Sequence, residues 1–302
     1  MTNFKIIQKR NIWLGISAVL FVIFASSLCV WGLKYGIDFT GGSLLEAKFT
    51  AARPQVSAVS SSLEELKLSS LIIQPVGEND IMLKFQETEE QTHQAVLSKL
   101  NQAAKQENEN NSVEEQRFES VGPSIGAELK IKSFWAIFFA LLAMLCYMTY
   151  AFRKVSKPVA SWKYGLAAII AMFHDVIITM GVFAFLGHYY GIEINTAFVA
   201  AILTVLGYSV HDTIVVFDRL RENLPKSNED FEGTVNTSLN QTIARSINTS
   251  LTVLLVLAAI IIFGGSSIRT FTMALAIGIF IGTYSSIFVA SPILVVWEKR
   301  KK

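Results

Sequence analysis

The stretch LGYSVHDTIVVFDRLREN, residues 206–223, begins like a membrane helix and ends like an aqueous surface. Residues 196–208 contain no charged side chain, yet His211 and Asp212 follow in the same helical run. Four apolar residues at 214–217 then resume the membrane pattern. Ionisable side chains inside membrane helices are costly and usually face the bundle interior or a wet path. The stretch therefore predicts a membrane helix that carries a functional carboxylate near one end.

The composition is also typical of a membrane protein. Hydrophobic residues make up 52% of the chain and charged residues 17%, below the quarter or so that is usual in soluble domains. The net charge of +2 does not indicate an acidic polymer as a partner. Cys29 and Cys146 both lie inside apolar runs, so a framework of disulfides is not expected.

Six apolar runs are long enough to cross a bilayer core of about 30 Å, which needs roughly 20 helical residues. They cover residues 12–33, 134–152, 164–186, 196–217, 247–263 and 271–297. The first run is too long for the core of a signal peptide and lacks an A-x-A cleavage site, so we expect an uncleaved helix. The predicted fold is an α-helical polytopic membrane protein with six transmembrane helices.

Lys and Arg gather at one side of these predicted helices. That side has Lys5, Lys9, Arg10, Arg153, Lys154, Lys157, Lys163, Arg219, Arg221, Lys226, Lys299, Arg300, Lys301 and Lys302. On the other side, residues 187–194 have no Lys or Arg, and residues 264–269 have only Arg269. Because basic residues mark the cytoplasmic side, both termini are predicted to be cytoplasmic.

Three parts of the chain follow from this topology: 1–33 with the first helix, 34–132 outside the cytoplasm, and 133–302 with the other five helices. The middle part has an α+β pattern with the β-α-β-β-α-β order of a ferredoxin-like domain. Its expected strands are 43–49, 71–76, 81–85 and 117–121, and its expected helices are 56–66 and 90–105. The polar tract 106–116 is expected to be a solvated loop.

Two of the predicted membrane helices contain a His-Asp pair, His174-Asp175 and His211-Asp212. Each carboxylate either forms a hydrogen bond between helices or exchanges protons, and for Asp175 both interpretations stay open. Arg245 favours proton exchange at Asp212, because the fourth and fifth helices run in opposite directions and bring these two residues to a similar depth.

Thr249 follows Arg245 by four residues and therefore shares its helix face. A carboxylate, a guanidinium and a hydroxyl could thus converge between the two helices. A carboxyl group alone in apolar surroundings favours the protonated form, whereas a nearby guanidinium favours the carboxylate. Alternation between these states could couple proton flow to work. His211 is a weaker candidate, since packing explains it equally well.

Other chemistries lack their motifs. The G-x-G-D signature of intramembrane aspartyl proteases is absent, as are a P-loop, an H-x-x-x-H pair and a cluster of carboxylates. The sequence has no basic surface interleaved with aromatic residues, so nucleic acid is not an expected partner. We therefore expect no enzymatic activity, no metal and no cofactor.

The opening stretch resembles the fourth-helix signature of the SecF members of the SecD/SecF family of bacterial protein-export membrane proteins. Further resemblances follow in the order of the chain: YGIDFTGGSLLE (35–46), VGPSIGAEL (121–129), FHDVIIT (173–179), LNQTIARSINTSLT (239–252), FGG (263–265) and IGTYSSIFVASPIL (281–294). Several long motifs in sequence are far more specific than a single short one.

The resemblance implies a six-helix domain of the type found in resistance-nodulation-division transporters, in the bacterial cytoplasmic membrane. It also implies work with SecD and the SecYEG translocon, using the proton gradient late in the translocation of unfolded preproteins. Asp212, Arg245 and Thr249 match positions proposed for the proton path of the family. At His211, relatives are expected to have Asn.

Only one six-helix half is present, which predicts a SecD partner. Gly278 and Gly282 could allow close approach of a partner helix, although packing within this chain explains them too. Two alternatives remain: a half-transporter of a small molecule or lipid, and a scaffold that needs no titratable residue. The small size of the 34–132 domain favours the export subunit, because drug-pump halves carry much larger soluble domains.

Overall fold

The computed structural model describes residues 4–152 and 160–299, so the predicted basic residues at 153, 154, 157 and 300–302 lie outside the described residues. The chain divides into two compact units. One consists of Met1–Lys34 together with Ser133–Lys302, and the other of Tyr35–Lys132. We refer to them as the membrane unit and the outer unit.

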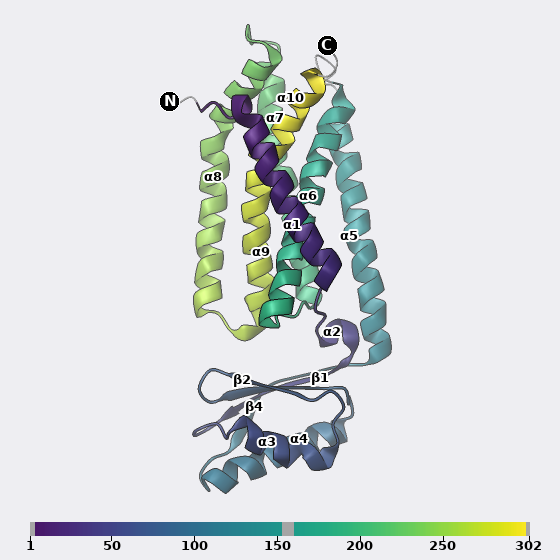
Figure 1. Cartoon of the computed structure of the whole chain (residues 1–302), viewed down its shortest axis with the longest axis vertical. Helices are drawn as coiled ribbons and strands as arrows, with labels where there is room; N and C mark the ends of the chain where they lie inside the picture. The colour runs from purple at the N-terminus through teal and green to yellow at the C-terminus, as the bar shows by residue number, and fades with distance from the viewer. Residues whose placement is uncertain (1–3, 153–159, 300–302) are drawn as a thin grey trace. The chain divides into compact units, whose positions relative to one another are not determined.

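Within the described chain, six helical spans are long and apolar enough to cross a membrane, which confirms the six predicted spans. They are α1 (Arg10–Trp31), α5 (Pro123–Ala151), α6 (Ser161–Tyr190), α7 (Thr196–Asn223), α8 (Phe231–Phe263), and a composite span of α9 (Ser266–Ser285), a π-helical segment (Ser286–Ala290) and α10 (Ser291–Lys299) (Figure 1).

The largest difference from the predicted bounds is in α8, which begins at Phe231 instead of residue 247. Its first turns are polar, so hydropathy does not detect them, but local capping forms the helix there. The Asp230 side chain accepts a hydrogen bond from the Gly233 backbone N–H, which satisfies one of the free donors at the helix start.

The membrane unit has three inner and three outer spans. In the most apolar window of α6, α7 and the α9–α10 span, 50% to 67% of residues are buried, against 6% to 17% for α1, α5 and α8. Gly278 and Gly282 of α9 lie against Val205 and Ser209 of α7, and a Cβ at Gly278 would come within 2.3 Å of the Val205 side chain. These glycines therefore serve helix packing within this chain.

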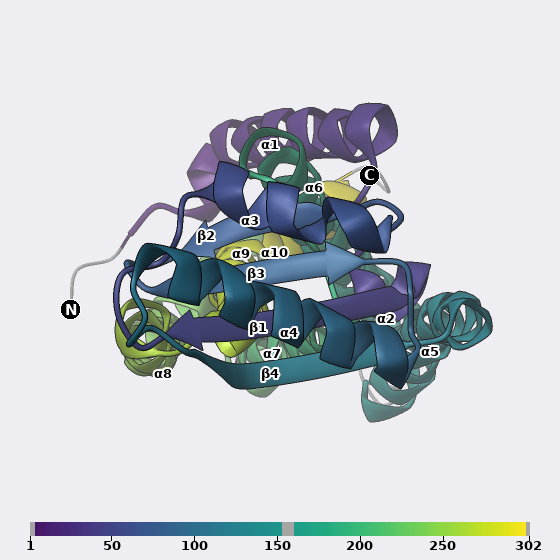
Figure 2. The same ribbon diagram turned by 90° about the horizontal axis from the view of Figure 1, so that it is seen from below.

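The outer unit contains a four-stranded sheet of order β2-β3-β1-β4, in which every neighbouring pair is antiparallel. In chain order its elements are α2 (Ile37–Thr40), β1 (Gly42–Phe49), α3 (Val56–Leu63), a 3₁₀ turn (Glu64–Leu66), β2 (Ile72–Val76), β3 (Asp80–Phe85), α4 (Glu90–Glu107) and β4 (Val113–Val121). The helices α3 and α4 lie over one face of the sheet (Figure 2). From β1 onward the order is the predicted β-α-β-β-α-β, which is compatible with a ferredoxin-like arrangement.

The expectation that 106–116 is entirely loop is wrong at both ends, because α4 continues to Glu107 and β4 begins at Val113 instead of residue 117. Val113 pairs with Phe49 at the far end of β1, and a register shift between Glu46 and Ala47 lets both strands continue. β4 is an edge strand with many exposed side chains, so its polar sequence lacks the apolar alternation by which strands are recognised.

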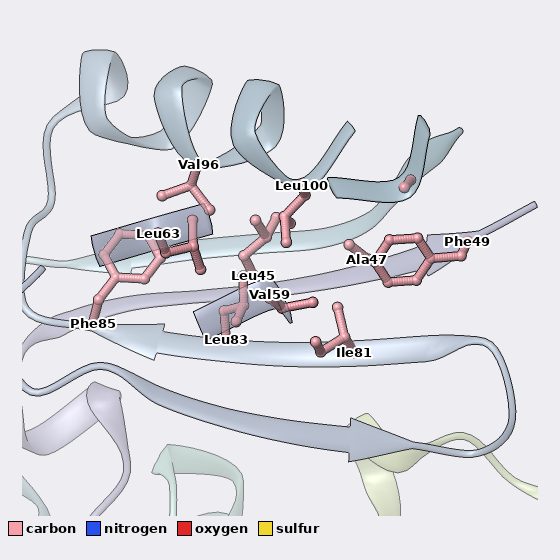
Figure 3. Close-up of a cluster of buried hydrophobic side chains, with 11 residues drawn as sticks. Leu45, Ala47, Phe49, Val59, Leu63, Ile81, Leu83, Phe85, Val96 and Leu100 are labelled. Atoms are coloured by element: carbon pink, nitrogen blue, oxygen red, sulfur yellow. The ribbon is translucent and has the colours of Figure 1, made fainter. Parts of the chain in front are cut away.

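A hydrophobic core joins the sheet to α3 and α4 (Figure 3). Every second residue of β1 points into it, as expected for a strand with one covered face. The fully or nearly fully buried members are Leu45, Ala47, Phe49, Val59, Leu63, Ile81, Leu83, Phe85, Val96, Leu100 and Ala104. The outer unit thus has a core of its own.

Candidate proton-transfer site

Asp212 of α7 is buried, with 7% of its surface exposed. Its Oδ1 accepts a hydrogen bond from the Ser246 hydroxyl of α8 over 2.5 Å. Its Oδ2 is buried and has no hydrogen-bond partner among the described residues. An unpaired carboxylate oxygen in such a setting is costly, because it has lost its contact with water. Asp212 is therefore a carboxyl group with one satisfied and one open position.

The predicted antiparallel pairing of the fourth and fifth helices is present. Besides the contact of Asp212 with Ser246, the Tyr208 hydroxyl lies 3.0 Å from Ser250 Oγ. Farther along, Asn223 Nδ2 donates to Ser238 Oγ over 2.9 Å. The structure confirms that the start of α8 lies beside the end of α7.

The two residues predicted to join Asp212 lie elsewhere on α8. Arg245 and Thr249 are both exposed, and no ion pair between Arg245 and Asp212 occurs within the part of the chain that the structure describes. Successive residues of a helix point about 100° apart, so Arg245 points to one side of Asp212 when Ser246 faces it. The predicted convergence of three groups is thus replaced by a contact between Asp212 and Ser246, and the roles of Arg245 and Thr249 stay predictions.

Arg245 lines a cavity of about 330 Å³ between α7 and α8. The polar residues around this cavity are Asp218, Arg219, Glu222, Gln241, Thr242 and Arg245. It lies toward the end of the bundle that carries the C-terminus of α7. A polar cavity of this size has room for several water molecules.

His211 is exposed while Asp212 next to it is buried, so the His-Asp pair of α7 does not form one unit. The pair on α6 is different. His174 Nδ1 lies 3.0 Å from Asp175 Oδ1, and both side chains are buried. His174 thus contacts the carboxylate of Asp175, whereas the His211 side chain is exposed.

Asp175 joins three inner helices. Its Oδ2 accepts hydrogen bonds from Ser209 Oγ of α7 over 2.6 Å and from Ser285 Oγ of α9 over 2.7 Å. With His174 at Oδ1, both oxygens have partners and the residue has no exposed surface. This is the interhelical hydrogen bonding considered for Asp175 above. Of the two membrane carboxylates, Asp212 is the one with an oxygen free to take up a proton.

The sequence interpretation missed Ser209, Ser246 and Ser285, the serines that bond the two carboxylates. A usable signal exists for Ser246, because hydroxyl residues recur every fourth position around it in α8. No group of three or more His, Cys, Asp or Glu side chains that could hold a metal ion occurs among the described residues.

Comparison with known proteins identifies the family. Residues 101–300 match the family described as "Protein export membrane protein SecD/SecF, C-terminal", and residues 27–52 match the "SecD/SecF GG Motif". The chain belongs to the SecD/SecF family. It is therefore a multi-pass protein of the bacterial inner membrane and of the Sec protein-export pathway, as its resemblance to SecD/SecF proteins implied.

Curated SecD/SecF relatives match nearly the whole chain. A "Protein translocase subunit SecF" from Thermobaculum terrenum is 42% identical and covers 98% of this chain and 94% of its own. Another from Anaerolinea thermophila is 38% identical and covers 97% and 94%. The crystal structure of SecDF from Thermus thermophilus, described as "a translocon-associated membrane protein", has a TM-score of 0.80 and 31% identity over 99% of this chain. This chain spans 39% of that longer SecDF chain.

The structure gives a physical reason for the GG motif of the SecD/SecF family at Gly41 and Gly42. Their φ angles are +76° and +118°, in the region that favours glycine. A Cβ at Gly42 would lie 2.6 Å from the Phe85 carbonyl oxygen, and one at Gly41 would lie 2.7 Å from Pro123 Cα. The motif lets the backbone turn into β1 while passing close to β3 and to the start of α5.

Proposed function

We propose that this chain is a proton-motive-force-coupled accessory subunit of the Sec translocase that acts with SecD. In this role it promotes the late translocation and release of secreted proteins. The observation that carries the proposal is Asp212, a buried carboxyl group with one oxygen unpaired. The names of the relatives support the Sec pathway, and the Thermus SecDF chain supports a SecD partner.

Proton uptake and release at Asp212 would supply the energy. Each elementary charge that crosses 100 mV releases about 2.3 kcal/mol, so the gradient itself is the energy source and no bound cofactor is needed. Deprotonated Asp212 needs a compensating positive charge, because an isolated buried carboxylate is strongly unfavourable. Arg245 is the one basic residue of α8 and adjoins Ser246, so it can provide this charge.

A rotation of α8 by one residue would exchange the partner of Asp212. Because neighbouring residues differ by about 100°, such a rotation replaces Ser246 with Arg245. Only 17% of the apolar window of α8 is buried, but the rotation also has to exchange hydrogen bonds between its polar first half and α7, such as Asn223 to Ser238. Ser246 would face protonated Asp212 and Arg245 the carboxylate.

The exposed side of α8 supports a partner in the membrane. Arg245, Asn248, Thr249 and Thr252 are exposed and follow one helix face, which we call the polar outer face. Arg245 precedes the apolar run of α8, so its exposure to lipid costs less than the roughly 2.5–3.5 kcal/mol that insertion scales give for the centre of a span. A second six-helix bundle, that of SecD, would cover this face and remove most of the cost. The SecYEG channel and an unfolded preprotein would be the further partners of this assembly.

The described basic residues support an orientation with cytoplasmic termini. Lys5, Lys9, Arg10, Lys163, Arg219, Arg221, Lys226 and Lys299 lie at the end of the membrane unit where α7 ends. The outer unit, inserted between α1 and α5, would then lie outside the cytoplasm.

The variant Asp212→Asn tests the proposal, because asparagine keeps the size and hydrogen-bonding capacity of the residue but cannot ionise. Release of a secreted substrate from membrane vesicles should lose its dependence on the proton gradient and fall to the level of a deletion. Asp230→Asn is a matched control, since asparagine also caps helices and the residue lies outside the site. Normal gradient-dependent release by Asp212→Asn, at normal abundance in the membrane, would show that the residue is structural.

A further inference from the structure

The buried face of α8 carries a hydroxyl group at every fourth residue. The set is Thr234, Ser238, Thr242, Ser246 and Ser250, each at most 6% exposed, and we call it the α8 hydroxyl stripe. A spacing of four residues places successive hydroxyls on one face, about 6 Å apart along the helix axis. Close packing alone would be served equally well by alanine or glycine.

Two observations independent of the stripe indicate what it serves. Asp212, which is bonded to Ser246 of the stripe, has its second carboxylate oxygen buried without a partner among the described residues. One turn away, Thr242 lines the cavity of about 330 Å³ that also exposes the carboxylates of Asp218 and Glu222. The stripe thus connects a polar cavity to a carboxyl group with an open position.

The hydrogen bonds of the stripe change their partners at the level of Asp212, from backbone carbonyls of α8 to side chains of other helices. Ser238 and Thr242 donate to the backbone carbonyls of Thr234 and Ser238 in their own helix. Ser246 instead donates to Asp212 of α7.

Ser250 lies within hydrogen-bond distance of two other hydroxyls. Its Oγ is 2.5 Å from Thr283 Oγ1 of α9 and 3.0 Å from the Tyr208 hydroxyl of α7. Side-chain hydroxyls that bond other hydroxyls or a carboxyl can accept one proton while they release another.

We propose that protons move between Asp212 and the cavity along the α8 hydroxyl stripe, through Ser246 and Thr242. This inference rests on the proposed function, in which Asp212 exchanges protons. It places the path inside this bundle, along the buried side of α8, whereas Arg245 and Thr249 are exposed.

Each step conserves atoms and charge. The Asp212 carboxyl group turns to point its proton at Ser246, and the Ser246 O–H turns away from Asp212 toward a water molecule on the Thr242 side. Asp212 then gives its proton to Ser246 Oγ, while Ser246 releases its own hydroxyl proton to that water. Asp212 becomes a carboxylate, Ser246 is unchanged apart from its O–H direction, and the proton reaches water in the cavity. One water molecule with two hydrogen bonds of about 2.8 Å spans the 6 Å or so between adjacent hydroxyls of the stripe.

The test measures gradient-driven proton uptake in right-side-out membrane vesicles that contain this chain with its natural membrane partners, matched for the amount of chain. Thr242→Val removes a stripe hydroxyl and keeps the shape of the side chain, and Ser246→Ala removes another. Both should lower the uptake rate several-fold and increase the ratio of the rates in H₂O and D₂O. Thr242→Ser and Ser246→Thr, which restore a hydroxyl, should return both quantities toward the wild type.

Thr272→Val is the matched control. Thr272 of α9 is also buried and donates to the carbonyl four residues before it, Ile268, over 2.9 Å, but it lies outside the stripe. Its rate and isotope ratio should equal those of the wild type.

Three results would contradict either the proton path or the proposed function. Wild-type rates and isotope ratios for both Thr242→Val and Ser246→Ala would refute the path while leaving the role of Asp212 intact. An equal loss in Thr272→Val would show that any buried hydroxyl has this effect, which also refutes the path. Unchanged uptake in Asp212→Asn would instead refute the proposed function.

Discussion

Asp175 gives the sharpest separation between a structural and a titrating carboxyl group. Its Oδ2 holds Ser209 and Ser285, and its Oδ1 lies beside His174 Nδ1. In Asp175→Asn the amide oxygen can still accept from both serines, and the amide nitrogen can donate to His174 Nδ1 in its unprotonated form. We therefore expect Asp175→Asn to keep its stability and most of its export activity.

Asp175→Ala should behave differently. Ser285 has a second acceptor in the Gly282 carbonyl at 3.1 Å, so its loss is close to the membrane average of about 0.6 kcal/mol per interhelical hydrogen bond. Ser209 loses the acceptor of its hydroxyl, which costs about 1–3 kcal/mol for a buried donor. The expected destabilisation is therefore about 2–4 kcal/mol.

The assay is unfolding of the purified chain in mixed micelles with increasing denaturing detergent, followed by tryptophan fluorescence. Gradient-dependent export is measured in parallel at equal abundance. The order of stability should be wild type, then Asp175→Asn close behind, then Asp175→Ala. If Asp175→Asn is as stable as the wild type but exports as poorly as Asp212→Asn, Asp175 must ionise and the structural assignment is wrong.

Further predictions concern topology, the switch residue, assembly and the outer core. A reporter that is active only outside the cytoplasm should be active when fused after Gln106 and silent after Lys226; the reverse pattern would invert the proposed orientation. Arg245→Lys should export nearly as poorly as Asp212→Asn, because lysine lacks the planar guanidinium and can lose its proton when buried, and full export would remove Arg245 from the mechanism. Gentle detergent extraction should recover the chain with a larger multispan partner, whereas recovery as a monomer would favour a free-standing transporter. Leu45→Ala should destabilise the outer unit by about 2–5 kcal/mol in hydrogen-exchange measurements, since Leu45 is fully buried in its core; an unchanged exchange rate would contradict that assignment.

The sequence was sufficient for the six spans and for the β-α-β-β-α-β order. Both depend on local sequence patterns. A long apolar run indicates a membrane span, and alternating apolar and polar residues indicate a strand, without any knowledge of how the elements pack. Asp212 was recognised as a buried carboxyl group for the same reason, since a charge inside an apolar run needs an interior position.

The side of α8 that faces Asp212 could not be predicted in this way. Arg245 and Ser246 are adjacent, and a shift of one residue decides which of them contacts α7. That choice depends on how α8 packs against α7 and α9, whereas the sequence favours Arg245 only because of its charge. The predicted fourth strand is shorter than β4 for a related reason, because the pairing of Val113 with Phe49 is a long-range contact that the polar residues around it do not reveal.

The position of the outer unit in the chain has a mechanical consequence. Its two covalent connections lead into α1 and α5, whose apolar windows have the smallest buried shares of the six spans, 11% and 6%. A pull on the outer unit is therefore delivered along the chain to the two spans with the least side-chain burial. The hydrogen bonds of Asp175, which tie α6, α7 and α9 together, carry none of this load directly. The outer unit is thus connected to α1 and α5, and not to the helices α6, α7 and α9 that hold the buried carboxyl groups in place.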